Sequence, residues 1–338
     1  DACIKDIRNF DIGKAYEAMR KNAFESPADE KDYLDGMGRR ALRSYLKYGY
    51  IPLEDGVPDA FHVKEQVSRT LEYAYDDFVL AQVARLLQKE EDYKVLSARA
   101  RNYRHVIDPQ TGYAQGRHAD GTFLKEQNAF QFTKFITEGA PCHYTWYVPH
   151  DPYGLMECMG GRDNFVQKLD SMFSEHRYWH GNEPCHQVAF MFNYAGEPWK
   201  TQQAVRHIME TEYLNAPGGL SGNDDAGQMS AWYIFASLGF YPVCPGSPFY
   251  VLASPSFPKA VLHLENGKSF ILQAENASEE NIYIQKVTLN GKAYTKNYIS
   301  HKDIIAGGEM VFTMGNTPNK TWGNTPEDCP PSLIEVAE

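Results

Sequence analysis

The sequence lacks the features of a membrane-spanning chain and of a cysteine-bound metal module. It contains no run of about 18 or more apolar residues, the length that a transmembrane helix needs, and its first residues do not resemble a signal peptide. Its six cysteines include no CxxC pair, which argues against a zinc cluster. Six cysteines in a chain of this length are compatible with either redox compartment.

Basic residues are fewer than acidic residues. The chain has 33 Lys and Arg against 44 Asp and Glu, so its formal net charge is −11. This balance argues against nucleic acid or an anionic membrane as a partner. Aromatic residues are abundant at 13%, with 22 tyrosines. Such residues fill a large core or line a ligand cleft, including carbohydrate clefts.

The spacing of apolar residues predicts a mainly helical chain up to residue 243. In residues 64–88, the longest such segment, apolar residues recur at the period of one helical face. We expect about eight antiparallel helices joined by polar loops. The predicted helices are 11–24, 38–48, 64–88, 90–106, 139–147, 161–174, 183–194, 198–213 and the segment that follows Asp225.

The composition changes at Val243. Residues 244–338 are rich in proline, β-branched and aromatic residues, and several segments alternate as strands do. Asn290-Gly291 is a hairpin signal. We therefore predict two domains, a helical one in 1–243 that carries the site and an antiparallel β-rich unit in 244–338.

The segment 221–240, SGNDDAGQMSAWYIFASLGF, combines polar ligands with an apolar helix. Asn223, Asp224 and Asp225 precede the helix, where unpaired backbone N–H groups and the helix dipole favour anions. Asp225 with Gln228 resembles a capping box. Two adjacent carboxylates exceed what a cap needs, so a site that holds a cation or a polar substrate is the other interpretation.

Two further loops share this layout of an acid near glycine or asparagine before an aromatic segment: residues 137–151 and 179–202. Glycoside hydrolysis requires one protonated and one ionised carboxyl group. Glu138 suits the protonated role if burial against Phe135, Trp146 and Tyr147 raises its pKa. A glutamate at a helix start is the structural alternative. Asp224 and Asp225 suit the ionised role.

Oxygen ligands are concentrated in the same loops. Asn182 and Glu183, with Asp224 and Asp225, offer the hard donors that calcium prefers, although the spacing of an EF-hand is absent. Glu183-Pro184 also suits a helix start. Histidines and tryptophans in these loops suit hydrogen bonding and packing as well as ligand contact.

Long motifs in these loops resemble glycoside hydrolase family 92, the calcium-dependent exo-acting α-mannosidases. They are EGAPCHYTWYVPHD, HGNEPCHQVAFMFNYAGEPWKTQ and GNDDAGQMSAWYIFASLGFYPV, with SRTLEYAYDDF and FTMGNTPNKTWG beside them. The resemblance implies an N-terminal β-sandwich, an (α/α)6 barrel and hydrolysis with inversion, using a glutamic acid as general acid, aspartates as base and a calcium ion.

Carried onto this chain, the resemblance makes Glu138 the general acid and puts Asp224 and Asp225 on the base side. It implies a calcium shell that includes Asn182, Glu183 and Asp225. The residues that it implies at the sugar are His143, Trp146, His180, His186, Trp199 and Lys200. The family's Trp-Gln is Cys142-His143 here, which changes the substrate contacts near Glu138.

About eight helices are too few for a twelve-helix barrel, and no N-terminal sandwich is present. We therefore expect the C-terminal half of a longer enzyme, against which the other half packs, with reduced activity alone. The expected substrate is a terminal α-mannose of an oligosaccharide or N-glycan, and the expected location is periplasmic, secreted or on a bacterial surface. A catalytically silent carbohydrate-binding or scaffold fragment, and a metal-free glycosidase, are the alternatives.

Overall fold

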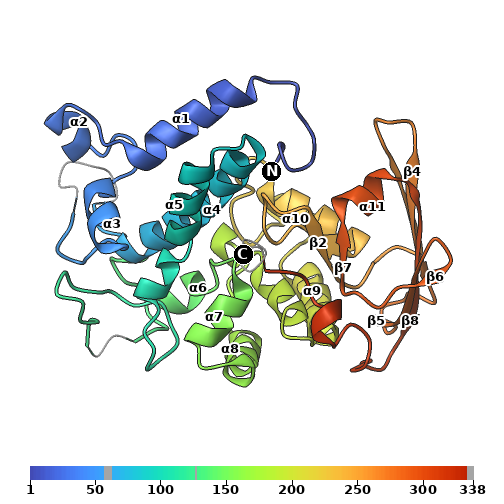
Figure 1. Cartoon of the computed structure of the whole chain (residues 1–338). Coiled ribbons are helices and arrows are strands. Elements are labelled where there is room, and N and C mark those ends of the chain that lie inside the picture. The colour runs from blue at the N-terminus through green and yellow to red at the C-terminus, as the bar shows by residue number, and fades with distance from the viewer. Residues whose placement is uncertain (57–62, 126–127, 333–338) are drawn as a thin grey trace. The chain divides into compact units, whose positions relative to one another are not determined.

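The computed structural model describes residues 1–56, 63–125 and 128–332. Among them two compact units are distinguished, Asp1–Asn164 and Phe165–Ser332. Helices occupy the chain as far as Leu238 and strands follow from Phe240 (Figure 1). The change from helix to strand thus lies close to the predicted boundary at 243/244. The division into compact units lies elsewhere, within helix α8, and the two predicted domains stay a prediction.

The first unit is helical. Its helices are α1 (Ile12–Phe24), α2 (Glu30–Leu34), α3 (Leu42–Tyr48), α4 (Gln66–Leu86), α5 (Glu90–Arg99), the 3₁₀ helix η1 (Asn102–Val106), α6 (Pro141–Tyr144), α7 (Pro152–Cys158) and the start of α8 (Arg162–Ser174). The predicted helices 11–24, 64–88 and 161–174 are confirmed to within a few residues. The prediction missed the short helices α2 and α7, because five and seven residues give too few turns for a periodic pattern.

Helix α4 is the long central helix of this unit. It packs against α1 and α5 through a cluster of buried apolar residues that includes Tyr16, Leu80 and Leu96. One acid on α4 is also buried. Asp77 is inaccessible to solvent, and its carboxylate is bonded by Arg39 at 2.6 Å, by Arg99 at 2.8 Å and by the Tyr45 hydroxyl at 3.0 Å. Two arginines and a tyrosine thus compensate the buried charge.

The second unit begins with helices and ends with strands. Its helical elements are the rest of α8, the 3₁₀ helices η2 (Glu183–Cys185) and η3 (Val188–Asn193), α9 (Pro198–Thr211), α10 (Gln228–Leu238), α11 (His301–Ile305) and η4 (Pro326–Asp328). The single helix predicted over 183–194 is wrong. The side-chain amide of Gln187 donates to the carbonyl of Pro184 at 2.8 Å, which occupies an acceptor that a continuous α-helix would use.

The strands form two sheets. They are β1 (Phe240–Tyr241), β2 (Phe249–Leu252), β3 (Lys259–His263), β4 (Ser269–Glu275), β5 (Tyr283–Leu289), β6 (Lys292–Ala293), β7 (Tyr298–Ser300) and β8 (Gly308–Gly315). The first sheet has the order β1-β2-β7 and the second the order β3-β4-β8-β5-β6. The hairpin at Asn290-Gly291 is confirmed, since both residues have positive φ and join β5 to β6.

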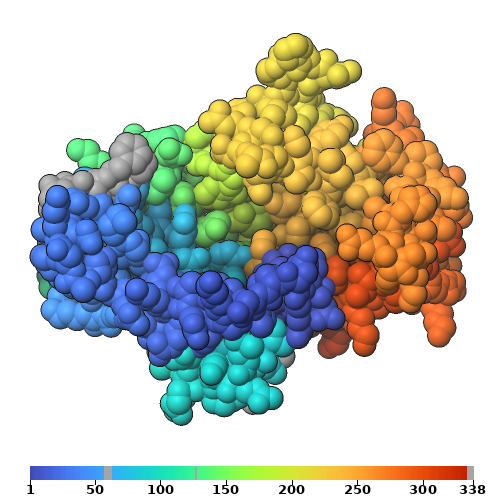
Figure 2. Space-filling model, turned by 90° about the horizontal axis from the view of Figure 1, so that it is seen from above, coloured from blue at the N-terminus to red at the C-terminus, as the bar shows by residue number. Residues whose placement is uncertain are grey.

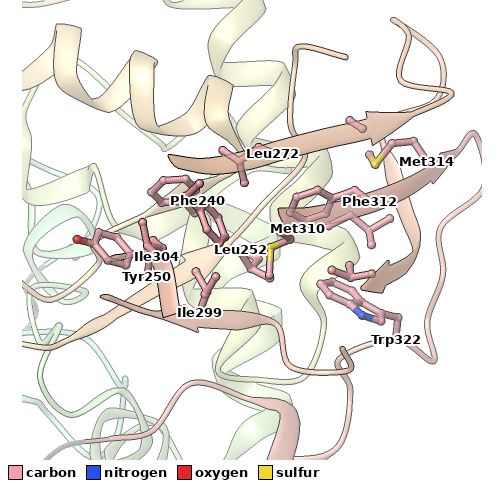
Figure 3. Close-up of a cluster of buried hydrophobic side chains, with 14 residues drawn as sticks. Phe240, Tyr250, Leu252, Leu272, Ile299, Ile304, Met310, Phe312, Met314 and Trp322 are labelled. Carbon is pink, nitrogen blue, oxygen red and sulfur yellow. The ribbon is translucent and has the colours of Figure 1, made fainter. Parts of the chain in front are cut away.

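The expectation of purely antiparallel strands is wrong at one place. Strands β4 and β8 run parallel, with Phe270 opposite Gly308. Strands β5 to β7 and helix α11 lie between them in the chain, and this long connection allows the crossover that a parallel pair needs. The inner faces of the strands share one apolar core, in which Phe240, Leu272 and Phe312 lie together with Trp322 (Figure 3).

Candidate functional site

Two of the three polar loops meet in the second unit, and two glycines make the meeting possible. A Cβ atom added to Gly222 would lie 2.5 Å from the Cα and 2.7 Å from the carbonyl carbon of Gly181. Because real Cβ atoms do not approach that closely, only glycine fits at this contact. The backbone contact places the segment with Asn182 and Glu183 beside the segment with Asp224 and Asp225. The expected convergence of these two loops is therefore observed.

Asp224 is tied to the start of helix α10. Its Oδ1 accepts hydrogen bonds from the backbone N–H of Ser230 at 3.0 Å and from the Ser230 hydroxyl at 2.8 Å. The hydroxyl bond, together with the backbone bond, lowers the pKa of the Asp224 carboxyl group. Asp224 is thus held ionised and in a fixed orientation, and the capping interpretation holds for this residue.

The backbone after Asp224 is left-handed over three residues. Asp225, Ala226 and Gly227 have φ values of 46°, 57° and 95°. Non-glycine residues rarely adopt this conformation, and such strain is concentrated at functional sites. The predicted capping box of Asp225 with Gln228 is wrong, because the N-cap of the helix is Gly227, which has no side chain. The turn leaves the Asp225 side chain exposed.

The segment that leads into this turn is exposed. Tyr213 and Leu220 form an isolated antiparallel bridge, and residues 214–218 between them are exposed, with 69% of Leu214 accessible. In Figure 2 the yellow part of the chain, which contains this segment, projects from the surface. The Asn223–Asp225 turn therefore follows directly on an accessible loop.

The third loop, around Glu138, belongs to the first unit, and its convergence with the other two stays a prediction. Helix α4 anchors it on both sides of Glu138. The backbone N–H of Thr137 donates to the Ser68 hydroxyl at 2.8 Å, and the Tyr144 hydroxyl donates to Glu72 at 3.1 Å. Glu138 itself has a left-handed φ of 49°. The predicted acid therefore also lies in unfavourable backbone that neighbouring contacts hold in place.

The expected burial of Glu138 is wrong, since its side chain is exposed. Phe135 and Trp146 are instead buried in the interior of the unit, with 5% and 0% of their surface accessible. The left-handed turn explains the difference, because the chain on either side of Glu138 is buried while the turn is not. The complete burial of Trp146 favours packing over the expected stacking against a sugar.

His143 stands close to the Glu138 turn. Its Nδ1 accepts a hydrogen bond from the backbone N–H of Ala140 at 3.2 Å, and its ring lies edge-on to Phe132. A Cβ atom on Gly139 would lie 3.3 Å from the same nitrogen. The histidine thus stabilises the start of α6 and packs against the chain beside Glu138. Its expected contact with substrate stays a prediction.

His180 and His186 lie in the interior of the second unit, with 0% and 1% of their surface accessible. Burial lowers the pKa of His180 to about 3 and also lowers that of His186, so both rings are neutral. The nitrogens of His180 contact the hydroxyls of Tyr178 and Tyr213. Protein groups, and not an open cleft, surround both rings. This observation counts against their expected contact with a sugar.

Trp199 and Lys200 line a groove between α8 and α9 that has a volume of about 540 Å³. Lys200 Nζ contacts Asp170 at 2.5 Å and Glu197 at 3.0 Å. Burial lowers the pKa of Lys200, but these two bonds outweigh it and raise the pKa overall. The groove lining does not include Asn182, Glu183 or the two adjacent aspartates. Trp199 and Lys200 thus form a feature distinct from the meeting of the two loops.

Metal-binding potential rests on oxygen atoms. Among the residues with described positions, no three His, Cys, Asp or Glu side chains form a cluster suited to a metal ion. The joined loops do supply two carboxylates and an amide, from Glu183, Asp225 and Asn182, and these hard donors fit calcium chemically. Within the same described parts of the chain, no helix has the length and apolar character needed to cross a bilayer.

The sequence reasoning did not predict three residues that contact the polar loops within their own units. Glu72 accepts a hydrogen bond from the Tyr144 hydroxyl, and burial raises its pKa to about 7. Ser68 lies one turn earlier on α4, so the spacing of four residues in SRTLEYAYDDF was the available signal. Tyr213 had no signal in the sequence, because its role depends on contacts made by folding.

Comparison with known proteins identifies the class. Two solved structures from Bacteroides thetaiotaomicron have the same fold and are glycoside hydrolases. The family GH92 α-mannosidase BT3965 has a TM-score of 0.88 and 40% identity, over 98% of this chain and 43% of its own. The family GH92 inverting mannosidase BT2199 has a TM-score of 0.89 and 36% identity, over 98% of this chain and 47% of its own.

The sequence comparison is more specific. The profile of the glycosyl hydrolase family 92 catalytic domain matches residues 1–316, and the chain belongs to this family. An uncharacterized secreted glycosidase of Arthroderma benhamiae is 31% identical over 366 residues, which cover 98% of this chain and 46% of that protein. The chain thus spans less than half the length of these relatives. An (α/α)6 arrangement of its helices stays a prediction.

Proposed function

We propose that this chain carries catalytic residues of an exo-acting α-mannosidase that inverts the anomeric configuration. The main structural support is the contact of Gly181 with Gly222, which brings together two loops that carry acidic residues. One of these loops contains the left-handed turn at Asp225. Family membership and the likeness to the inverting mannosidase BT2199 support the reaction type. BT3965 has been solved with mannoimidazole, which supports mannose as the sugar.

In the proposed reaction Glu138 donates a proton to the glycosidic oxygen as the bond to the sugar breaks. A water molecule attacks the anomeric carbon from the opposite face and gives its proton to an aspartate. We assign this base role to Asp225, because Oδ1 of Asp224 is already engaged by Ser230. Asp224 would fix the turn and orient the base. Inversion requires roughly 6.5–9.5 Å between the two carboxyl groups, which leaves room for the water.

Asn182, Glu183 and Asp225 would hold a calcium ion. When bound, calcium would bind hydroxyl groups of the sugar and favour its distortion towards the transition state. The residues of this chain would orient the sugar and hold the protons at Glu138 and Asp225. The donor set supports this assignment, since all three offer oxygen atoms.

A terminal α-linked mannose of an oligosaccharide or a glycoprotein glycan would be the substrate. The net charge of −11 is compatible with a neutral sugar and unfavourable for polyanions. The relative described as a secreted glycosidase supports an exported location.

Hydrolysis of an aryl α-mannoside tests this proposal, with NMR to detect the anomer that appears first. We expect the β-anomer. Glu138→Gln and Asp225→Asn should each lower kcat/KM by roughly a hundred- to ten-thousandfold. The matched controls Glu157→Gln and Asp163→Asn remove exposed surface carboxylates and should retain activity.

A chelator decides the role of the metal in the same assay. We expect activity to fall on chelation and to return with added calcium. Unchanged activity after chelation would indicate that the enzyme is a metal-free glycosidase. Mannose binding without turnover would indicate a carbohydrate-binding or scaffold role.

A further inference from the structure

Both ring nitrogens of His180 are held by tyrosine hydroxyls. Nδ1 lies 2.7 Å from the Tyr178 hydroxyl and Nε2 lies 2.6 Å from the Tyr213 hydroxyl. The imidazole is inaccessible to solvent and packs edge-on against Trp232, with ring centroids 4.4 Å apart. Its position is thus fixed by hydrogen bonds along the ring plane and by an aromatic neighbour.

The backbone carbonyl of Met229 fixes which group donates in each of these hydrogen bonds, because a carbonyl can only accept. The Tyr213 hydroxyl donates to the backbone carbonyl of Met229 at 3.0 Å. Its single proton is then used, so it accepts a hydrogen bond from Nε2–H of His180. The Nδ1 of His180 therefore has no proton and accepts from Tyr178. The chain Tyr178, His180, Tyr213, Met229 has one consistent direction, and we call it the His180 relay.

The relay joins the two loops that carry the proposed ligands and base. His180 lies two residues before Asn182, and Met229 is the second residue of α10, just after the Asp224–Gly227 turn. The His180 relay connects the two segments through side chains, in addition to the backbone contact of Gly181 with Gly222.

A second connection runs beside the relay. The Nε2 of His186 bonds to the carbonyl of His180 at 3.0 Å, and the indole N–H of Trp232 donates to the carbonyl of His186 at 2.9 Å. Trp232 belongs to α10, so the segment 180–186 is bound to this helix at both of its ends. The Tyr213 ring is stacked on Trp232 at 6.0 Å, which limits its rotation.

We propose that His180 and Tyr213 are positioning residues, which hold the Asn182–Glu183 segment at a fixed place relative to the Asp224–Asp225 turn. They act behind the site and not on the sugar. The link to catalysis rests on the proposed function, whereas the link between the two loops does not. A rigid supporting shell keeps oxygen ligands at the separation that a metal ion requires.

Tyr213→Phe tests the relay, since it removes one hydroxyl and keeps the ring. Tyr294→Phe is the matched control in the same unit. Its hydroxyl also donates to a backbone carbonyl, that of Tyr298 at 2.8 Å, but in the β-rich part. Both variants lose a hydrogen bond from a tyrosine hydroxyl to a backbone carbonyl, and Tyr213→Phe loses in addition the bond from His180. The comparison therefore separates loop positioning from the loss of a tyrosine hydroxyl elsewhere in the unit.

Hydrogen exchange measures the loops without reference to metal or substrate. We expect backbone amides in 181–187 and 223–229 to exchange about tenfold faster in Tyr213→Phe, because His180 Nε2–H loses its buried acceptor. In Tyr294→Phe these amides should exchange at the wild-type rate. A ¹H–¹⁵N spectrum of the histidine rings should show His180 protonated at Nε2 in the wild type and a mixture of tautomers in Tyr213→Phe.

Calcium affinity connects the relay to the site. We expect Tyr213→Phe to raise the Kd for calcium about tenfold, as loss of supporting hydrogen bonds does at other metal sites, and Tyr294→Phe to leave it unchanged. Wild-type exchange rates in both loops of Tyr213→Phe, or equal acceleration in Tyr294→Phe, would overturn the positioning role. Absence of calcium binding in the wild type would instead reject the metal part of the proposed function. The exchange data would still test whether His180 and Tyr213 position the two loops.

Discussion

Gly181 and Gly222 touch backbone to backbone. A Cβ atom on Gly181 would lie 2.8 Å from the carbonyl oxygen of Ser221 and 2.7 Å from the indole nitrogen of Trp179. A side chain at either glycine would separate two loops that each carry acidic residues. The contact thus explains why the motifs HGN and SGN both have glycine before asparagine.

Gly222→Ala should therefore push the loops apart. The added methyl group meets backbone atoms of Gly181, which cannot rotate away as a side chain can. We expect a loss of about 1–3 kcal/mol in the free energy of unfolding and a larger relative loss of mannosidase activity. Urea denaturation and an aryl α-mannoside assay measure the two effects. Gly13→Ala meets only Asp11 at 3.4 Å and should retain both, and full activity in Gly222→Ala would contradict the explanation.

Local patterns in the sequence predicted much of this structure. The helical period over 64–88 found α4, and Asn290-Gly291 found the hairpin, because both signals lie within one element. The parallel pairing of β4 with β8 could not be predicted in this way, since it joins segments about forty residues apart.

The same limit applies to the site. Motifs led to the prediction of Asp225 and Glu183 as site residues, but nothing in them tells which glycines meet or that both ring nitrogens of His180 contact tyrosine hydroxyls. The exposure of Glu138 was also missed, because an apolar sequence neighbourhood does not show that the residue itself lies in a left-handed turn. Contacts between distant segments decide these features.

Backbone strain at the Asp225 turn can be tested through its neighbour. Ala226 has a φ of 57°, which costs an alanine more than a glycine. Ala226→Gly should therefore raise the free energy of unfolding by about 0.5–1 kcal/mol, whereas Ala231→Gly within α10 should lower it by a similar amount. Thermal or urea denaturation measures both changes. A destabilised Ala226→Gly would mean that the turn is not strained.

The buried carboxylate of Asp77 should be essential for the stability of the first unit. Asp77→Ala leaves Arg39 and Arg99 without their buried partner, and we expect a loss of about 3–5 kcal/mol. Asp76 has 55% of its side chain accessible and lies 3.7 Å from Arg39, so Asp76→Ala should cost less than about 1 kcal/mol. Urea denaturation of the two variants gives the comparison. Equal losses would show that the network does not stabilise the fold.

Glu72 should make stability depend on pH. Burial raises its pKa from 4.5 to about 7, against a lowering by the hydrogen bond from Tyr144. Asp76 and Glu65 raise this pKa and Arg69 lowers it. Because the folded chain retains the Glu72 proton up to about pH 7 and the unfolded chain releases it near pH 4.5, this group's contribution to stability falls as the pH rises through that window.

Glu72→Gln cannot titrate and retains an acceptor for Tyr144. Between pH 5 and pH 8, the free energy of unfolding of the wild type should fall by about 1–3 kcal/mol relative to that of the variant. In Tyr144→Phe the donor that favours the ionised carboxylate is absent, so the decline should extend to higher pH than in the wild type. Urea denaturation at a series of pH values measures all three proteins. A parallel pH dependence of the wild type and Glu72→Gln would show that Glu72 titrates as an ordinary carboxyl group, and α4 would then support the Glu138 loop through hydrogen bonds whose strength does not change near neutral pH.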